Sequence, residues 1–245
     1  MDTAHTVLLG VVEGITEFLP ISSTGHLLIA EHWLGSRSEL FNVGIQAGAM
    51  LAVIGIFWHR LLQLCNLRDP ANRDYVLKLA LAFIVTMAGG LVVKKLGWSL
   101  PDTVTPVALA LIIGGVVILG VEALVANRPP NGRVTWHAAF WVGASQILAA
   151  VFPGTSRSAA TIFAAMLAGT TLRPAATEFA FLVGVPTMFA ATGYELLKLP
   201  RADFATESWG DLALGVGLDV RTNSKPPGNL KKTDTLTTAN LVYAF

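Results

Sequence analysis

Long apolar stretches alternate with short polar segments along this chain of 245 residues. A membrane-spanning helix needs about 17 to 25 predominantly apolar residues, and four stretches have roughly that length. They lie at residues 41–64, 75–96, 104–125 and 177–197. Charged residues, prolines and glycines separate them, as is typical of helix ends. The pattern predicts an all-α polytopic membrane protein with about four full spans.

Two further apolar segments are interrupted by polar residues. Residues 7–34 contain Glu13, Glu17, a proline and a Ser-Ser-Thr-Gly-His run, while residues 137–169 contain a glutamine, a Pro-Gly turn and an arginine between serines. Non-helical backbone is tolerated at membrane depth only where protein buries it or where it lines a wet cavity. We therefore expect each segment to form a re-entrant helix-loop-helix hairpin.

The two interrupted segments are similar to one another. Gly10 and Pro20 are ten positions apart, and so are Gly143 and Pro153. A similar helix opening follows each hairpin, FNVG from residue 41 and FLVG from residue 181. These similarities indicate an internal repeat, with chance similarity between apolar segments as the alternative. The common register aligns Glu13 with Gln146, Ser23 with Ser156, and Thr24 with Arg157.

The number of spans sets the orientation of the second copy. A first copy with one hairpin and three spans crosses the membrane an odd number of times, so the second copy enters from the opposite face. Such an inverted repeat places the functional site near the midplane, where the broken helices meet. We expect one transmembrane domain over residues 1–218, with copies at about 6–126 and 137–218. Residues 219–245 are polar and rich in Pro, Lys and Thr, which predicts a solvent-exposed tail.

Composition narrows the function classes. Hydrophobic residues make up 53% of the chain and charged residues 13%, against about 25% charged residues in ordinary globular proteins. A net charge of +1 argues against nucleic-acid binding, which needs a concentrated basic face. The single cysteine, Cys65, excludes an intrachain disulfide and a CxxC metal site.

Basic residues give the chain an expected orientation in the membrane. The loops after the first and third spans carry an excess of arginine, which by the positive-inside rule makes them cytoplasmic. The N-terminal hairpin then opens outward and the second hairpin inward. The arginines concerned are Arg60, Arg68, Arg73, Arg128 and Arg133.

Two glutamates lie on one face of the first short helix. Glu13 and Glu17 are four positions apart, so their carboxylates are about one turn from each other. Ionisable groups at membrane depth are costly and mark functional sites. The pair could chelate a hard divalent cation such as Mg²⁺ or Ca²⁺, or one carboxylate could act as a general base. Two solvated glutamates on an interfacial helix are the alternative.

A polar turn follows these acids. Pro20 ends the helix, and Ser22, Ser23 and Thr24 come next. Hydroxyls and backbone N–H groups at the start of a helix form a cradle for anions. His26 could act as a nucleophile or as a general acid or base, because imidazole titrates near neutrality. A hydrogen-bonded core histidine is the alternative.

Arg157 is the other costly charge in the interrupted segments, and it follows Ser156 after a Pro-Gly turn. A guanidinium matches phosphate oxygens bidentately, so this position predicts an anionic ligand. The alternative is a structural ion pair with Glu13 or Glu17, and both can hold together. Gln46 could line the site, although a hydrogen bond between helices is the favoured explanation for it.

Together these groups suit phosphoryl chemistry in a membrane. A metal and an arginine neutralise charge on the phosphoryl oxygens while a positioned nucleophile attacks. A site embedded in lipid implies a substrate with a lipid tail.

Two segments of the chain carry a family resemblance. EGITEFLPISSTGH from residue 13 and PGTSRSAAT from residue 153 resemble the signature regions of the bacterial undecaprenyl-diphosphatases of the bacitracin-resistance type, and the resemblance covers about residues 6–218. It implies a multi-pass enzyme of the bacterial cytoplasmic (inner) membrane that hydrolyses undecaprenyl diphosphate to undecaprenyl phosphate and inorganic phosphate. This reaction recycles the lipid carrier for peptidoglycan synthesis, and therefore serves cell wall biogenesis and cell shape. Bacitracin sequesters the same substrate, which accounts for the link to resistance.

The resemblance also implies roles for individual residues. Glu13 and Glu17 would hold the divalent cation, and Glu17 would also take part in catalysis. Either the histidine or a serine could attack phosphorus, and we expect His26 rather than Ser23 to do so. The expected substrate-binding residues are Arg157, Ser156, Ser22, Thr24 and Gln46.

The end of the chain departs from the family pattern. Family members continue with two more spans where this chain has its polar tail, so a truncated inactive remnant is one alternative reading. A transporter or flippase of polyprenyl phosphate is another, because transporters share the inverted repeat and broken helices. The expected partners are a polyprenyl diphosphate lipid and the membrane, without nucleic acid. The sequence leaves a homo-oligomer open.

Overall fold

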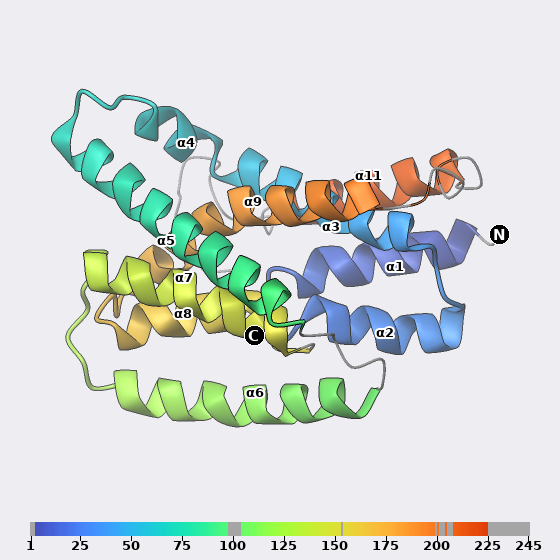
Figure 1. The fold of residues 1–245 in the computed structure, drawn as a ribbon, viewed down its shortest axis with the longest axis horizontal. Helices are drawn as coiled ribbons and strands as arrows, with labels where there is room; N and C mark the ends of the chain where they lie inside the picture. Colours follow the sequence, from blue (N-terminus) through green and yellow to red (C-terminus); the bar gives the residue numbers. More distant parts are fainter. Residues whose placement is uncertain are drawn as a thin grey trace, which may run out of the picture.

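The computed structural model describes residues 3–97, 104–152, 154–198, 200, 204 and 208–224, and this part of the chain is helical with no strand (Figure 1). The helices, in chain order, are α1 (Thr3–Thr16), α2 (Ser23–Leu34), α3 (Glu39–Ile56), α4 (Trp58–Leu64), α5 (Pro70–Lys95), α6 (Val104–Val125), α7 (Trp136–Val151), α8 (Arg157–Leu167), α9 (Arg173–Lys198) and α11 (Trp209–Ser224).

Four of these helices, α3, α5, α6 and α9, are long and apolar enough to cross a membrane. They confirm the predicted spans, with one correction. The stretch 41–64 is not a single helix, because α3 ends at Ile56 and α4 begins at Trp58 after a break at Phe57. The Arg60 Nε lies 2.8 Å from the Glu178 carboxylate, and this ion pair ties α4 to α9.

Both interrupted segments form the expected hairpins, α1–α2 and α7–α8. The hairpins enter from opposite ends of the molecule, and their tips meet near its middle (Figure 1). Ser22 caps α2 by accepting a hydrogen bond from the Gly25 backbone N–H, and Ser156 caps α8 through the Ala159 N–H. Serine side chains favour these positions because they satisfy N–H groups that lack a partner within the helix. Pro153, in the second turn, lies outside the described residues.

Two close helix crossings reveal the inverted repeat in space. A Cβ on Gly10 of α1 would lie 2.8 Å from the carbonyl oxygen of Gly215 on α11, and one on Gly143 of α7 would lie 2.4 Å from that of Ala82 on α5. Gly10 and Gly143 are separated by 133 positions, and so are Ala82 and Gly215. Helix α11 therefore occupies in the second copy the place of α5 in the first. Each packs against the hairpin of the opposite copy.

Helix α11 extends beyond residue 218, the expected end of the domain. It continues to Ser224 and packs against α1 and α3, so residues 219–224, expected in the polar tail, are helical. The guanidinium of Arg37 helps to hold α11, since it lies 3.9 Å from the Asp211 carboxylate and also contacts the Thr6 hydroxyl. Residues 225–245, the rest of the expected tail, lie outside the described residues.

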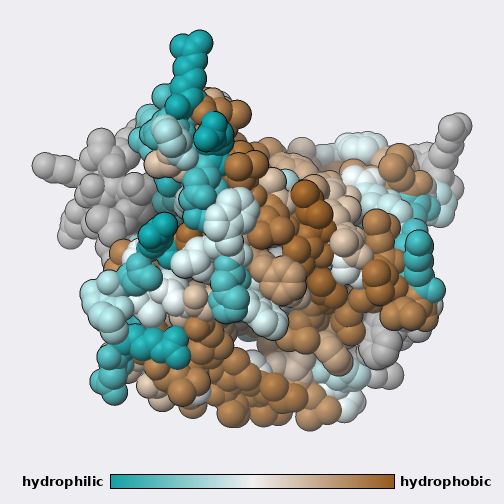
Figure 2. All heavy atoms as spheres, turned by 60° about the vertical axis from the view of Figure 1, so that its left-hand side comes forward, coloured by the Kyte–Doolittle hydropathy of each residue, from teal (hydrophilic) through white to brown (hydrophobic). Residues whose placement is uncertain are grey.

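The exterior is apolar where a soluble protein would be polar. Along α6, the side chains of Ile112, Ile113, Val116 and Leu119 are all more than half exposed. Figure 2 shows a broad hydrophobic surface across the lower part of the view, with hydrophilic side chains gathered at the left. Such a surface is unfavourable in water and suits contact with lipid. The chain is a multi-pass membrane protein.

Candidate active site

A pocket of about 250 Å³ lies where the tips of the two hairpins meet. Side chains from α2, α3, α5, α7, α8 and α9 line it, so residues far apart in the sequence share one cavity. Of the predicted site residues, His26 and Glu13 are not among those that line the pocket. Those that do are Glu17, Ser22, Ser23, Thr24, Gln46, Ser156 and Arg157.

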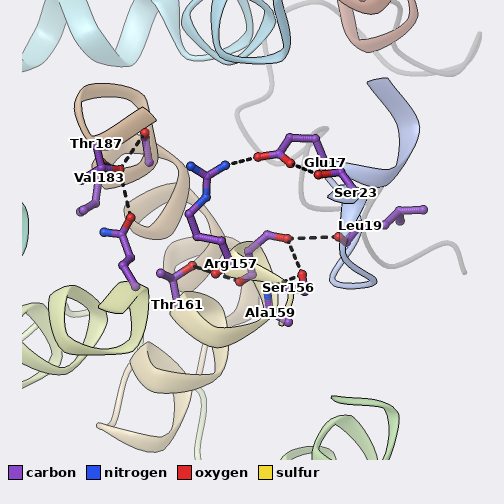
Figure 3. A network of polar contacts seen from close by, with 12 residues as sticks. Glu17, Leu19, Ser23, Ser156, Arg157, Ala159, Thr161, Val183 and Thr187 are labelled. Atoms are coloured by element: carbon purple, nitrogen blue, oxygen red, sulfur yellow. Dashed lines mark hydrogen bonds and ion pairs between the residues drawn. The ribbon is translucent and has the colours of Figure 1, made fainter. Parts of the chain in front are cut away.

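Glu17 connects the two hairpins. Its Oε2 accepts a hydrogen bond of 2.5 Å from the Ser23 hydroxyl, and its Oε1 pairs with the Nη2 of Arg157 (Figure 3). The side chains of Glu17 and Arg157 are only 10% and 21% exposed, so solvent screens this pair weakly. The ion pair foreseen as an alternative role for Arg157 is thus present, with Glu17 as the partner. A hydroxyl bonded to a carboxylate is also the arrangement that activates a nucleophile.

Arg157 has a further donor for a ligand. Its Nη1 is buried and has no hydrogen-bond partner among the described residues. The residue opens α8 directly after its N-cap, Ser156, and a helix N-terminus attracts anions through its partial positive charge and free N–H groups. An unpaired buried donor costs free energy. A phosphate oxygen bound here would satisfy it.

Hydroxyls of the second hairpin line the pocket beside Arg157. Ser158 donates to the Leu19 carbonyl oxygen at 3.1 Å and lies 3.1 Å from the Ser156 hydroxyl (Figure 3). Ser158 and Thr155 both line the pocket, although neither is among the site residues predicted from the sequence. Their place in the same Thr-Ser-Arg-Ser turn as Arg157 was the available signal.

Three polar residues from long helices line the other side of the pocket. Gln146 donates through Nε2 to the Thr86 hydroxyl oxygen at 3.2 Å, and the Thr187 hydroxyl lies 2.9 Å from the Gln146 Oε1. In the sequence, Gln146 stands out only as the counterpart of Glu13, and Thr86 and Thr187 do not stand out. A single threonine in an apolar helix usually bonds to its own backbone, so the sequence offers little signal for them.

Glu13 and His26 lie near the pocket without lining it. The Glu17 backbone N–H donates to the Glu13 carbonyl oxygen at 2.9 Å, so the two acids are one helical turn apart, as predicted, and Glu13 is fully buried. The Nδ1 of His26 lies 2.8 Å from the Ser22 carbonyl oxygen. Of the expected catalytic and metal-binding residues, the structure thus brings Glu17 and Ser23 into the pocket.

Oxygen ligands suited to a divalent cation are present in the pocket. The Glu17 carboxylate and the hydroxyls of Ser22 and Ser23 line it, and Mg²⁺ and Ca²⁺ prefer oxygen donors. Among the described residues, however, no three His, Cys, Asp or Glu side chains form a metal-binding group. Mg²⁺ is commonly held by one or two carboxylates together with substrate phosphates. The donors fit an ion shared with a phosphate ligand better than one held by protein alone.

Comparison with known proteins gives the family. The family model described as bacitracin resistance protein BacA matches residues 6–218. The chain belongs to this family. The match covers the same residues as the resemblance noted in the sequence, and it includes both hairpins and the pocket. A second model, a protein of unknown function termed DUF481, matches residues 201–245 and so overlaps the first over 201–218.

Curated relatives share most of this length. A protein of Rhizobium johnstonii is 60% identical over 224 residues, which are 91% of this chain and 84% of the relative. One from Xanthomonas axonopodis pv. citri is 56% identical over 215 residues, covering 87% of this chain and 81% of the relative. One from Stenotrophomonas maltophilia is 60% identical over 162 residues, covering 66% and 61%. All three bear the name undecaprenyl-diphosphatase.

Proposed function

We propose that this protein hydrolyses undecaprenyl diphosphate to undecaprenyl phosphate and inorganic phosphate. The contact that carries the proposal is the chain Ser23–Glu17–Arg157, which joins a nucleophile, a base and a phosphate-binding cation where the hairpins meet. The relatives named above support the substrate. The apolar exterior supports a lipid-tailed molecule that reaches the site from within the membrane.

Ser23 is the nucleophile in this proposal. Its hydroxyl already donates to Glu17, whereas His26 does not line the pocket and uses Nδ1 on the Ser22 carbonyl oxygen. As the Ser23 Oγ bonds to the terminal phosphorus, its proton passes to Glu17, and the bond from that phosphorus to the bridging oxygen breaks. Undecaprenyl phosphate leaves with the bridging oxygen.

Water completes the reaction. Glu17 passes the first proton to the departing phosphate and then takes a proton from water, which attacks the phosphoserine. The bond between phosphorus and Oγ breaks, Glu17 returns the proton to Ser23, and inorganic phosphate leaves. Through both steps the Nη1 of Arg157 and the N-terminus of α8 stabilise the negative charge of the phosphoryl oxygens.

A divalent cation, Mg²⁺ or Ca²⁺, is part of the proposal. When bound by Glu17 together with the substrate phosphates, it would neutralise charge on the phosphoryl group. Glu13, buried one turn before Glu17, would add negative charge close to that ion.

We also propose the bacterial inner membrane as the location, with the first hairpin opening outward. The arginine-bearing loops between α4 and α5 and between α6 and α7 lie at one end of the molecule (Figure 1), and α1 begins and α2 ends at the other. The positive-inside rule makes the arginine end cytoplasmic. Recycling of the lipid carrier on the outer side would serve cell wall synthesis and resistance to bacitracin.

The test is release of phosphate from a short-chain polyprenyl diphosphate by the purified protein in detergent. Ser23→Ala should abolish release, while Ser145→Ala, a serine of α7 that donates to the Val142 carbonyl oxygen and does not line the pocket, should retain it. Chelation by EDTA should also stop it. A folded wild-type protein that binds the lipid and releases no phosphate would overturn hydrolysis in favour of transport or an inactive remnant.

A further inference from the structure

The pocket has two chemically different sides. Glu17, Ser23 and Arg157 form the charged side, which performs the steps proposed above. The other side is uncharged and consists of Thr86 on α5, Gln146 on α7 and Thr187 on α9. These three residues have no part in those steps. In Figure 3 the Arg157 guanidinium lies between Glu17 of the charged side and Thr187 of the uncharged side.

Hydrogen bonds fix the uncharged side in one orientation. The Gln146 Oε1 lies 2.9 Å from the Thr187 hydroxyl, and Nε2 donates to Thr86. The Thr86 hydroxyl in turn lies 3.0 Å from the Gly143 carbonyl oxygen and 2.9 Å from that of Ala82. Because Nε2 carries two hydrogens, one remains for a ligand. Gln146 is only 3% exposed and Thr187 only 7%, so the two threonines hold this N–H donor in place before a ligand arrives.

The inverted repeat places different residue types at equivalent positions of the two copies. Gln146 stands 133 positions after Glu13, in the register that relates the two copies, and both side chains are buried. An amide and a carboxylate have nearly the same shape, but the amide donates hydrogen bonds and carries no charge. A carboxylate at position 146 would repel a phosphate, whereas an amide binds one. Position 146 of the second copy can therefore accept an anion, unlike its counterpart, Glu13, in the first.

Reaction geometry indicates which phosphate belongs on that side. In phosphoryl transfer the attacking and leaving oxygens lie roughly in line on opposite faces of the phosphorus. If Ser23 attacks from the charged side, the leaving phosphate extends toward the uncharged side. Arg157, between the two, can contact oxygens of both phosphoryl groups.

We propose that Thr86, Gln146 and Thr187 form the sub-site for the lipid-linked phosphoryl group, the one that is not transferred. The inference rests on the proposed hydrolysis. In this proposal, the three residues determine the selectivity for a diphosphate over a monophosphate. They hold the leaving group and the charged side performs the transfer.

Binding of two non-hydrolysable probes tests the sub-site without turnover. Methylenediphosphonate spans both phosphoryl positions, whereas inorganic phosphate needs only the charged side. Gln146→Leu removes the free N–H and should weaken methylenediphosphonate binding about tenfold or more, as expected for a hydrogen bond to a charged group. Thr86→Val removes only the oxygen that orients Gln146 and should weaken it less. Both variants should leave phosphate binding within about twofold. The KM for a short-chain polyprenyl diphosphate should rise by a similar factor, while kcat falls less. Thr86→Ser, which keeps the hydroxyl, should restore binding.

Thr177→Val is the matched control. Thr177 lies on α9 with Thr187 and is buried, but it does not line the pocket, so both probes should bind to this variant as they bind to wild type. Gln146→Glu gives a second, nearly isosteric variant if Gln146→Leu fails to fold, and it should weaken the diphosphonate most. Equal weakening of both probes, or unchanged binding of the diphosphonate to every variant, would overturn the sub-site. Retained turnover in Ser23→Ala would overturn the proposed mechanism alone, since probe binding is measured separately.

Discussion

The guanidinium of Arg157 pairs with the carboxylate of Glu17 across the point where the two hairpins meet. The residues are 140 positions apart in the chain, and each comes from a different copy of the inverted repeat. Because the second Arg157 nitrogen remains available, the same side chain can orient the base and bind a phosphoryl oxygen. The site therefore needs both copies of the repeat, because one supplies Glu17 and the other supplies Arg157.

Removal of this guanidinium should stop catalysis. Loss of one preorganised donor to the transition state typically lowers kcat by about 10²–10³, and Arg157→Ala also leaves Glu17 without its ionic partner. Arg157→Lys should recover only a small part of the activity, since an ammonium cannot hold Glu17 and a phosphate oxygen with the same planar geometry. Steady-state release of phosphate measures both variants. Activity of Arg157→Lys equal to wild type would contradict a dual role.

The nucleophile can be assigned by comparing two substitutions. Ser23→Ala removes the hydroxyl that donates to Glu17 and should reduce turnover to background. His26→Ala breaks the contact with the Ser22 carbonyl oxygen and should cost less, on the order of tenfold, through a displaced turn. His26→Asn, which can still donate to that carbonyl, should restore part of the loss. Trapping of a phosphoenzyme on the Ser23 peptide by mass spectrometry would support serine, and a phosphohistidine would refute it.

The two close helix crossings should be sensitive to a single methyl group. At Gly143 and Gly10 a new Cβ would meet backbone oxygen at 2.4 and 2.8 Å, so Gly143→Ala and Gly10→Ala force the helices apart. Overpacking of this kind costs about 1–3 kcal/mol. Gly114→Ala on α6 is the control, because a Cβ there meets nothing within 4 Å and alanine favours a helix by about 1 kcal/mol. Thermal unfolding in detergent should rank Gly143→Ala lowest and Gly114→Ala at or above wild type.

A shared cation gives a distinctive binding signature. If Glu17 holds the ion only together with phosphate oxygens, Mg²⁺ alone should raise the unfolding temperature little. Mg²⁺ with methylenediphosphonate should raise it more than the two separate shifts combined, because each ligand increases the affinity for the other. Glu17→Gln should remove this synergy. A large shift with Mg²⁺ alone would indicate a site built from protein ligands and would contradict the shared ion.

The sequence identified best the charged residues, because burial of a charge is costly. Glu17 and Arg157 stood out because a charge within an apolar segment needs a functional or structural reason, and both line the pocket. Thr86 and Thr187 did not stand out, because a threonine hydroxyl can be satisfied by the backbone of its own helix. Their role became visible only when Gln146 was found between them.

Helix α11 is not evident from the sequence, for a similar reason. It is short and includes Asp211 and Asp219 among its apolar residues, so hydropathy alone did not mark it. Its place depends on Gly215, which allows the close approach to Gly10, and on the contact between Arg37 and Asp211. These partners are distant in the sequence, so no local pattern could reveal the helix.

The sequence by itself determined the four spans, the two hairpins, their repeat register and seven of the residues that line the pocket. These features follow from local hydropathy, from helix-breaking residues and from the cost of burying charge, which are all properties of neighbouring residues. Only the tertiary structure decided that Glu17 and Ser23 line the pocket while Glu13 and His26 do not, and that α11 is the counterpart of α5. These outcomes depend on the angles and distances at which separate helices pack, and those are fixed by contacts between residues far apart along the chain.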